Sequence, residues 1–118
     1  MKRSPIVIHA SPVIAKCIKV FVKPGHMEDF LAAQRIWNEH SRRADGYLGE
    51  FVGRDPAAPD IVHVHLCWRS REDLARFMAE GHDRIAVLAR ADEHYDRIEV
   101  RVLDAVDPAT TGLHGTKR

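Results

Sequence analysis

The spacing of hydrophobic residues along this chain predicts a strand-helix-strand unit, followed by a second unit of the same kind. In the first copy, residues 13–22 alternate between apolar and polar positions with a period of two, as a half-buried strand does. Residues 26–43 then carry apolar side chains three and four apart, which predicts an amphipathic helix that ends at the Asp45-Gly46 turn signal. A second strand is predicted over 47–54, which completes the first unit.

The second copy follows the same plan, with one interruption in its helix. Residues 61–68 alternate cleanly, and Ser70 followed by an aspartate three positions later resembles a helix start. Gly81 is expected to break that helix, and Asp83 is placed to cap a second short helix over 84–90. We expect a functional site to border this interruption.

With a last strand over 95–103, the order of elements is βαββαβ. Two such units with antiparallel pairing predict a ferredoxin-like α+β sandwich, in which a four-stranded antiparallel sheet carries two helices on one face. A chain of 118 residues has room for one core of this kind. We expect a single domain over 13–106, an N-terminal extension over 1–12 and a flexible C-terminal tail over 107–118.

Composition disfavours several kinds of partner. The chain is 45% hydrophobic and 30% charged, as ordinary soluble proteins are. Its net charge is +1, with Lys and Arg scattered among Asp and Glu, so we expect no nucleic-acid partner. No apolar run approaches the roughly 20 residues that span a bilayer. We therefore expect no membrane association, a cytoplasmic location and two reduced cysteines.

The sheet face opposite the helices predicts a homodimer. Part of that face is apolar and part ionisable, and a four-stranded sheet of this size would otherwise leave its apolar part wet. A second copy of the same sheet is the economical cover. The residues expected on this face are Cys17, Lys19, Phe21, Tyr47, Gly49, Phe51, His63, His65, Cys67, Arg97, Glu99, Arg101 and Leu103.

Several short motifs follow the predicted elements in order. They are Gln34-x-x-Trp37, Gly46-Tyr47-Leu48-Gly49, Trp68, Phe77-Met78, His82-Asp83-x-Ile85 and Tyr95-x-x-Ile98-Glu99-Val100. Together they resemble the dimeric α+β barrel superfamily over roughly residues 15–104. The nearest branch contains short bacterial proteins that are similar to the antibiotic biosynthesis monooxygenase domain and have no assigned function.

The resemblance implies a range of activities on one fold. The superfamily includes quinone-forming monooxygenases that use neither metal nor flavin, haem-degrading enzymes, muconolactone isomerases, chlorite dismutase relatives and proteins without known activity. Haem-degrading members use an Asn on the first strand and a Trp and an iron-binding His on the second helix. Here the first strand has no Asn, Phe77 stands at the Trp place and His82 comes too early. We therefore expect no haem, and no cofactor.

His82 and Asp83 are the leading catalytic candidates, with Glu99 as a third. Histidine is the side chain whose ordinary pKa lies near neutrality, so His82 could act as a general base oriented by Asp83 or Glu99. The alternative is structural: a polar helix break in which Asp83 caps and His82 bonds to backbone. For Glu99, ion pairs with Arg97 and Arg101 are the favoured alternative.

Four residues are candidates for binding a substrate. Gln34 and Tyr95 each place a polar tip beside apolar neighbours, where it could orient a ligand or make an internal hydrogen bond. Trp37 and Trp68 lie on the apolar sides of their elements, and so are favoured as core residues over platforms for substrate.

A metal site is the weaker hypothesis for the other face. His63, His65 and Cys67 alternate along one strand and so project from one side, and imidazole with thiolate suits zinc or copper. Cys17 could join them if the first and third strands are neighbours. Because no fourth ligand is fixed, cavity lining or a dimer interface is the favoured reading of these residues.

The sequence therefore favours a small homodimeric protein with a pocket between sheet and helices, acting as a cofactor-independent monooxygenase or related enzyme. Its substrate would be a small aromatic or conjugated molecule. Whether the chain is an enzyme is left open, since a non-catalytic ligand-binding or stress-associated dimer would show the same pattern. A metal-binding protein acting through His63, His65 and Cys67 is the second alternative.

Overall fold

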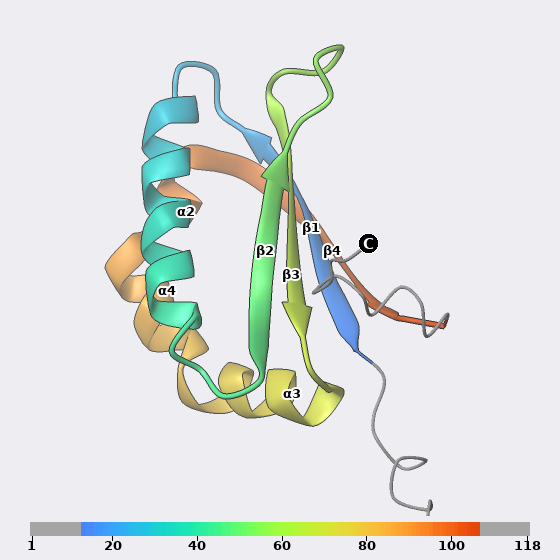
Figure 1. The fold of residues 1–118 in the computed structure, drawn as a ribbon. Helices are drawn as coiled ribbons and strands as arrows, with labels where there is room; N and C mark the ends of the chain where they lie inside the picture. The colour runs from blue at the N-terminus through green and yellow to red at the C-terminus, as the bar shows by residue number, and fades with distance from the viewer. Residues whose placement is uncertain (1–12, 107–118) are drawn as a thin grey trace, which may run out of the picture.

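A four-stranded sheet with helices on one face forms the body of the computed structural model, which describes residues 13–106 (Figure 1). The elements in chain order are β1 (Ile14–Val22), α2 (Met27–Ser41), β2 (Tyr47–Gly53), β3 (Ile61–Trp68), α3 (Arg71–Glu80), α4 (His82–Ala89), the 3-10 helix η1 (Ala91–His94) and β4 (Tyr95–Asp104). The predicted extension over 1–12 and tail over 107–118 lie outside the described residues.

The strands pair in the order β2-β3-β1-β4, and every pair is antiparallel. Helices α2 and α4 lie on the same side of the sheet, and α3 crosses near one end of it (Figure 1). This is the ferredoxin-like α+β arrangement that the two strand-helix-strand units predict, and the prediction of the fold is confirmed. No helix within residues 13–106 is long and apolar enough to cross a membrane.

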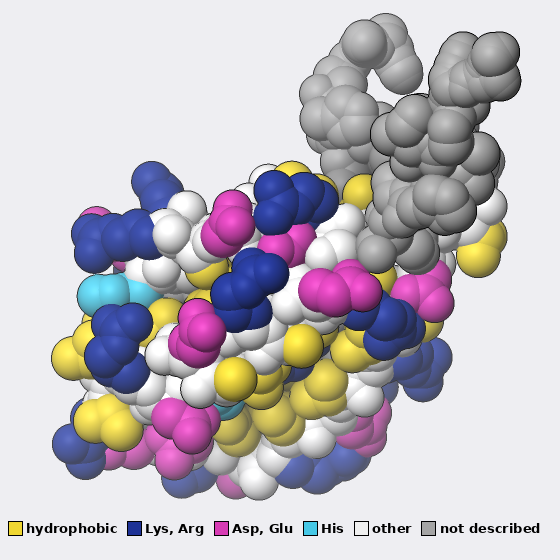
Figure 2. Space-filling model, turned by 90° about the horizontal axis from the view of Figure 1, so that it is seen from below, with side chains coloured by type: hydrophobic (Ala, Val, Ile, Leu, Met, Phe, Trp, Pro, Cys, Tyr) yellow, Lys and Arg dark blue, Asp and Glu magenta, His cyan; other side chains and the backbone are white. Residues whose placement is uncertain are grey.

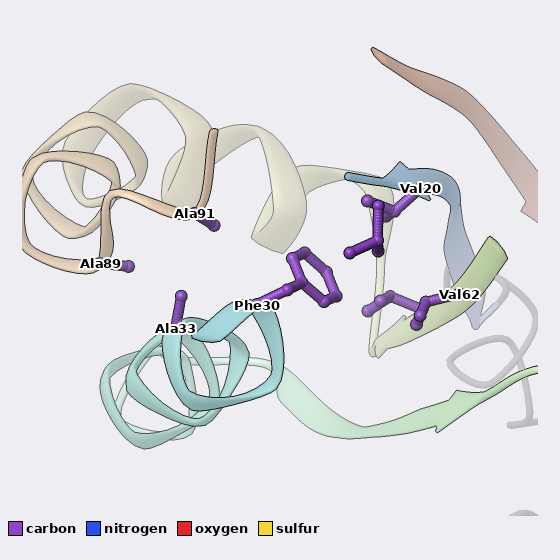
Figure 3. Close-up of a cluster of buried hydrophobic side chains, with 8 residues drawn as sticks. Val20, Phe30, Ala33, Val62, Ala89 and Ala91 are labelled. Carbon is purple, nitrogen blue, oxygen red and sulfur yellow. The ribbon is translucent and has the colours of Figure 1, made fainter. Parts of the chain in front are cut away.

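The core lies between the helices and the two central strands. Figure 3 shows Phe30 of α2 pointing toward Val20 of β1 and Val62 of β3, with each of these side chains no more than 2% exposed. Small residues, among them Ala33 and Ala89, bring α2 and α4 close together beside this group. Removing these apolar surfaces from water is what holds the helices on the sheet, because burial stabilises by about 25 cal/mol per Å².

Burial on the helix side of the sheet falls off toward β4. Val62, Val20 and Ile98 are register partners across β3, β1 and β4, and their exposed fractions are 2%, 2% and 39%. In the next row Val64 is 1% exposed, whereas Val100 is 49% exposed. The helices therefore leave the β4 side of this face less covered than its centre.

The start of β2 departs from simple alternation. The register between β2 and β3 shifts between Tyr47 and Gly49, and Gly49 has a φ of +138°, so β2 carries a bulge here. The shift also corrects one prediction. Tyr47 lies on the helix side and not on the opposite face, since its ring contacts Trp68 and its hydroxyl bonds to Asn38 of α2.

The interruption after α3 occurs where the glycine predicted it. Helix α3 ends at Glu80 and α4 begins at His82, with Gly81 between them. Ser70 caps α3, as predicted, by accepting a bond from the Asp73 backbone N–H at 3.1 Å. The capping role predicted for Asp83 is wrong, because α4 begins one residue before it and the Asp83 side chain bonds to His82 instead.

Candidate active site between sheet and helices

A cavity of about 600 Å³ lies between the sheet and the helices. Its floor is the helix-facing side of the strands, including Ile18, Val64, Ile98 and Val100, and its opposite wall comes from α2, α3 and α4. Most of the lining side chains are apolar, and a few polar ones are set among them. In volume and in lining it matches small-molecule sites, which span roughly 300–1,000 Å³.

The cavity is next to exposed apolar surface. Val87 of α4 belongs to the lining and is 73% exposed, and Ile98 and Val100 of β4 are exposed as well. Seen from below, the molecule shows hydrophobic side chains gathered among charged ones (Figure 2). An apolar molecule could therefore pass from solvent into the cavity along apolar surface.

His82 lines this cavity from the first position of α4. Its ring contacts two aromatic side chains, with centroid distances of 5.1 Å to Trp37 and 6.3 Å to Phe77. Its Nδ1 is 2.9 Å from Oδ1 of Asp83, and the two side chains are 29% and 97% exposed. When Nδ1–H donates to that carboxylate, Nε2 carries the lone pair that a base needs.

The four predicted binding residues all line the same cavity. Gln34 and Trp37 reach it from α2, Trp68 from β3 and Tyr95 from β4. Trp68 is 1% exposed, and its Nε1 has no hydrogen-bond partner among the described residues, so it is chiefly a core residue at the cavity wall. Burial raises the pKa of the Tyr95 hydroxyl, with a further contribution from nearby Asp92, so this hydroxyl stays protonated.

Glu99 is not part of this arrangement. It projects from the sheet face opposite the helices, where it pairs with Lys19 in register and its Oε2 accepts from Arg97 at 2.5 Å. The Arg97 bond holds the pKa of Glu99 below its usual range. The prediction that Glu99 orients His82 is therefore wrong, because the sheet lies between them, and the alternative ion pair with Arg97 is present.

The charged residues that line the cavity were not predicted from the sequence; they are Lys16, Glu50, Arg90, Asp92 and Glu93. The first two come from the sheet. Lys16 of β1 and Glu50 of β2 line the cavity, and both are register partners of Leu66, so they flank it in one row across the sheet. A signal was available for Lys16, because it occupies an apolar-phase position between Ile14 and Ile18. The bulge in β2 hid the corresponding signal for Glu50.

Burial shifts the pKa values of both side chains in the direction that favours their neutral forms. Burial lowers the pKa of the Lys16 amine, whose Nζ lies 3.5 Å from the sulfur of Met78. Burial likewise raises the pKa of Glu50, although a 3.1 Å bond from Gln34 Nε2 and the charge of Arg42 oppose the rise. The cavity thus holds two acid-base groups whose pKa values are shifted by burial, which is common at functional sites.

The sheet face opposite the helices, here called the open face, carries the other predicted ligands. Strands β1 and β3 are neighbours, as the metal hypothesis required, and Cys17 is the register partner of His65. However, within residues 13–106 the ligand atoms of His63, His65 and Cys67 do not converge within 4.8 Å as a group of three. His65 is exposed and its ring contacts Phe51 at 6.1 Å. Among the described residues, these three side chains are therefore not brought together as a set of metal ligands.

Comparison with known proteins agrees with the fold. The family model for a domain of unknown function, DUF4937, matches residues 14–103. No curated protein matches the sequence. A solved structure named "putative antibiotic biosynthesis monooxygenase" from Nitrosomonas europaea superimposes with a TM-score of 0.71 at 16% identity, covering 83% of this chain and 94% of that one.

Two further structures show the same likeness. A protein of the same name from Bordetella bronchiseptica gives a TM-score of 0.69 at 19% identity, covering 81% of this chain and 99% of that one. A conserved protein from Methanosarcina mazei gives 0.70 at 19% identity, with coverages of 84% and 98%. At these identities the likeness shows a shared fold.

Proposed function

The chain belongs to the DUF4937 family, and we propose that its cavity oxidises a small aromatic or conjugated carbon acid with dioxygen and without a cofactor. One observation carries the proposal: the His82 ring faces an apolar cavity of about 600 Å³ while its Nδ1 is held by a carboxylate. The names of the structures from Nitrosomonas europaea and Bordetella bronchiseptica support the same class of reaction.

His82 is the proposed base. Its Nε2 takes a proton from an activated carbon of the substrate, and the resulting carbanion, delocalised over the conjugated system, gives one electron to dioxygen. Recombination of the superoxide and the substrate radical forms a hydroperoxide, which loses water to leave a carbonyl group. In balance, a CH₂ group and O₂ become C=O and H₂O, so the substrate supplies all the electrons.

The remaining cavity residues are assigned to binding and orientation. Asp83 holds the His82 tautomer, and its 97% exposure makes this contribution a modest one because water screens the pair. Trp37 packs on the His82 ring and offers an aromatic face to a flat substrate. Gln34 and Tyr95 supply polar tips at the cavity wall.

Oxygen uptake with anthrone, a tricyclic carbon acid, tests this function. The native protein is expected to raise the rate of oxygen consumption, and His82→Gln is expected to lower that rate by about 10²–10⁴-fold, the usual worth of a positioned base. His65→Gln is the matched control, because His65 lies on the open face. Equal rates for the two variants would refute the assignment of His82.

A non-catalytic ligand-binding role is the second candidate, and one observation favours it. The Gln34 amide already donates a hydrogen bond to Glu50, so part of the hydrogen-bonding capacity of the cavity wall is taken up within the protein. Both tryptophans of the chain, Trp37 and Trp68, line the cavity, so ligand entry should change the intrinsic fluorescence. A fluorescence change without oxygen uptake, across a panel of conjugated carbon acids, would select this candidate.

We further propose that the chain is a homodimer joined through the open face. Phe51 and Leu103 on this face are 63% and 49% exposed, and no helix within residues 13–106 covers it. A second copy of the sheet would bury these groups. Light scattering should show a dimer for the native chain and a monomer for Phe51→Asp. Val87→Asp, exposed on the helix side, should remain dimeric.

A further inference from the structure

We infer that His26, Asp29 and His94 form a binding site for a divalent transition metal such as Zn²⁺. Their ligand atoms all lie within 4.8 Å of one another, and within residues 13–106 they are the group of three His, Cys, Asp or Glu side chains that converges in this way. Two imidazoles and one carboxylate suit zinc and its neighbours in the first transition row. This donor set is separate from the His63, His65 and Cys67 set on the open face.

The spacing of the two imidazoles fits a shared ion. The Nδ1 atoms of His26 and His94 are 3.1 Å apart, and the rings are tilted by 43°. Two nitrogens bound to one Zn²⁺ at about 2.0–2.1 Å lie about 3–3.5 Å apart at near-tetrahedral angles. Without metal the same distance serves a hydrogen bond in which one nitrogen donates. A cation would replace that proton, and the carboxylate of Asp29 would offset part of its charge.

The backbone holds these ligands together across 68 residues of sequence. The Lys23 N–H donates to the His94 carbonyl at 2.9 Å, and the His26 N–H donates to the Lys23 carbonyl at 3.0 Å. One short segment between β1 and α2 is therefore bonded to the end of η1. A site assembled by backbone bonds loses little entropy when it binds metal, which favours affinity.

The His26 side chain does not cap the helix at whose start it lies. It occupies the N-cap of α2, yet its imidazole makes no capping bond there. Asp29 lies on the first turn of the same helix and is exposed, whereas both histidines are half-buried. Three protein donors leave room for water to complete a four-coordinate ion.

A bound ion would link the start of α2 to the end of η1, just before β4, at one end of the cavity. Phe30, next to Asp29, and Tyr95, next to His94, both line that cavity and contact each other edge-to-face at 6.5 Å. The metal itself would lie outside the lining, since neither histidine belongs to it. It would therefore stabilise the fold and fix the cavity end, without taking part in the oxidation proposed above.

Calorimetric titration of the full chain, purified without an affinity tag, with Zn²⁺ tests the site. The expected result is about one ion per chain, a rise in melting temperature on binding, and visible d–d absorption when Co²⁺ replaces Zn²⁺. His26→Ala and Asp29→Asn should each weaken binding at least about tenfold, which is what loss of even an outer-shell partner does. His40→Ala, on the last turn of the same helix, is the matched control.

Either of two results would overturn the inference. One is a native chain that shows no saturable binding of Zn²⁺. The other is a chain whose His26→Ala and His94→Ala variants bind Zn²⁺ as tightly as His40→Ala does, which would place the ion elsewhere. His94 precedes Tyr95, which packs against the core, so His94→Ala could fold poorly. In that case His26→Ala and Asp29→Asn decide the test. Oxygen uptake does not enter this test.

Discussion

Replacing Gly46 with alanine should be far more costly than the same change at Gly25. Both glycines lie in the left-handed region, with φ of +89° and +80°, so each alanine variant meets a similar backbone strain of about 1–2 kcal/mol. A Cβ at Gly25 would meet nothing within 4 Å. At Gly46 it would lie 2.3 Å from Cγ of Asp73, so that carboxylate would have to move.

Asp73 has little freedom to move. Its side chain is 3% exposed and accepts bonds from Arg69 Nε at 2.8 Å, Ser70 Oγ at 2.7 Å and Arg76 Nη1 at 2.9 Å. Losing one or two such charge-assisted bonds costs about 1.5–3 kcal/mol each, toward the lower end here because both arginines are half-exposed and can rehydrate. The total for Gly46→Ala is then about 3–5 kcal/mol, against about 1–2 kcal/mol for Gly25→Ala.

Urea unfolding followed by tryptophan fluorescence measures both variants. The predicted difference of about 2 kcal/mol or more corresponds to roughly 8 °C or more in melting temperature for a domain of this size. The double variant Gly46→Ala/Asp73→Ala should cost less than the sum of its single changes, because both single changes lose the same bonds to the Asp73 carboxylate, although the close contact with the Cβ at position 73 persists. Equal losses at Gly46 and Gly25 would refute the reasoning, since they would mean that the Asp73 contacts do not constrain the turn.

Three further outcomes follow from the same contacts. Ser70→Ala removes the cap of α3 and should lower the free energy of unfolding by about 1 kcal/mol in urea. The bonds from Arg69, then those from Ser70 and Arg76, hold the pKa of Asp73 well below its usual range, so its stabilisation is complete above the unfolded value of about 4 and is lost as pH falls further. Acid unfolding of Asp73→Asn should accordingly depend less steeply on pH than that of the native chain. Burial lowers the pKa of Lys16, which means that its charged form destabilises the folded state; Lys16→Met should therefore raise the melting temperature at pH 7, and a fall would contradict this.

The periodicity of apolar residues predicted the fold because it indicates which side of each helix or strand is buried. The alternation over 61–68 matches β3 residue for residue, and the glycine at 81 separates two helices as expected. Local signals failed where backbone irregularity intervened. The bulge at the start of β2 moved Tyr47 to the helix side, and the early start of α4 removed the capping role of Asp83.

The candidate site was predicted in part, since His82, Gln34, Trp37, Trp68 and Tyr95 all line one cavity. Side chains brought together only by strand order were harder to predict. The row that joins Glu50 to Lys16 through Leu66 depends on sheet register, and the contact of His26 with His94 spans 68 residues. Neither follows from spacing along the chain.

Exchange of the acidic C–H of anthrone in D₂O, followed by proton NMR without oxygen, tests the proposed base most directly. Proton abstraction is then observed apart from oxidation. The account predicts that the native chain accelerates loss of the CH₂ signal and that His82→Gln reduces this acceleration by about 10²-fold or more, with His65→Gln unchanged. Exchange at the buffer rate, or equal exchange in the native chain and His82→Gln, would contradict it.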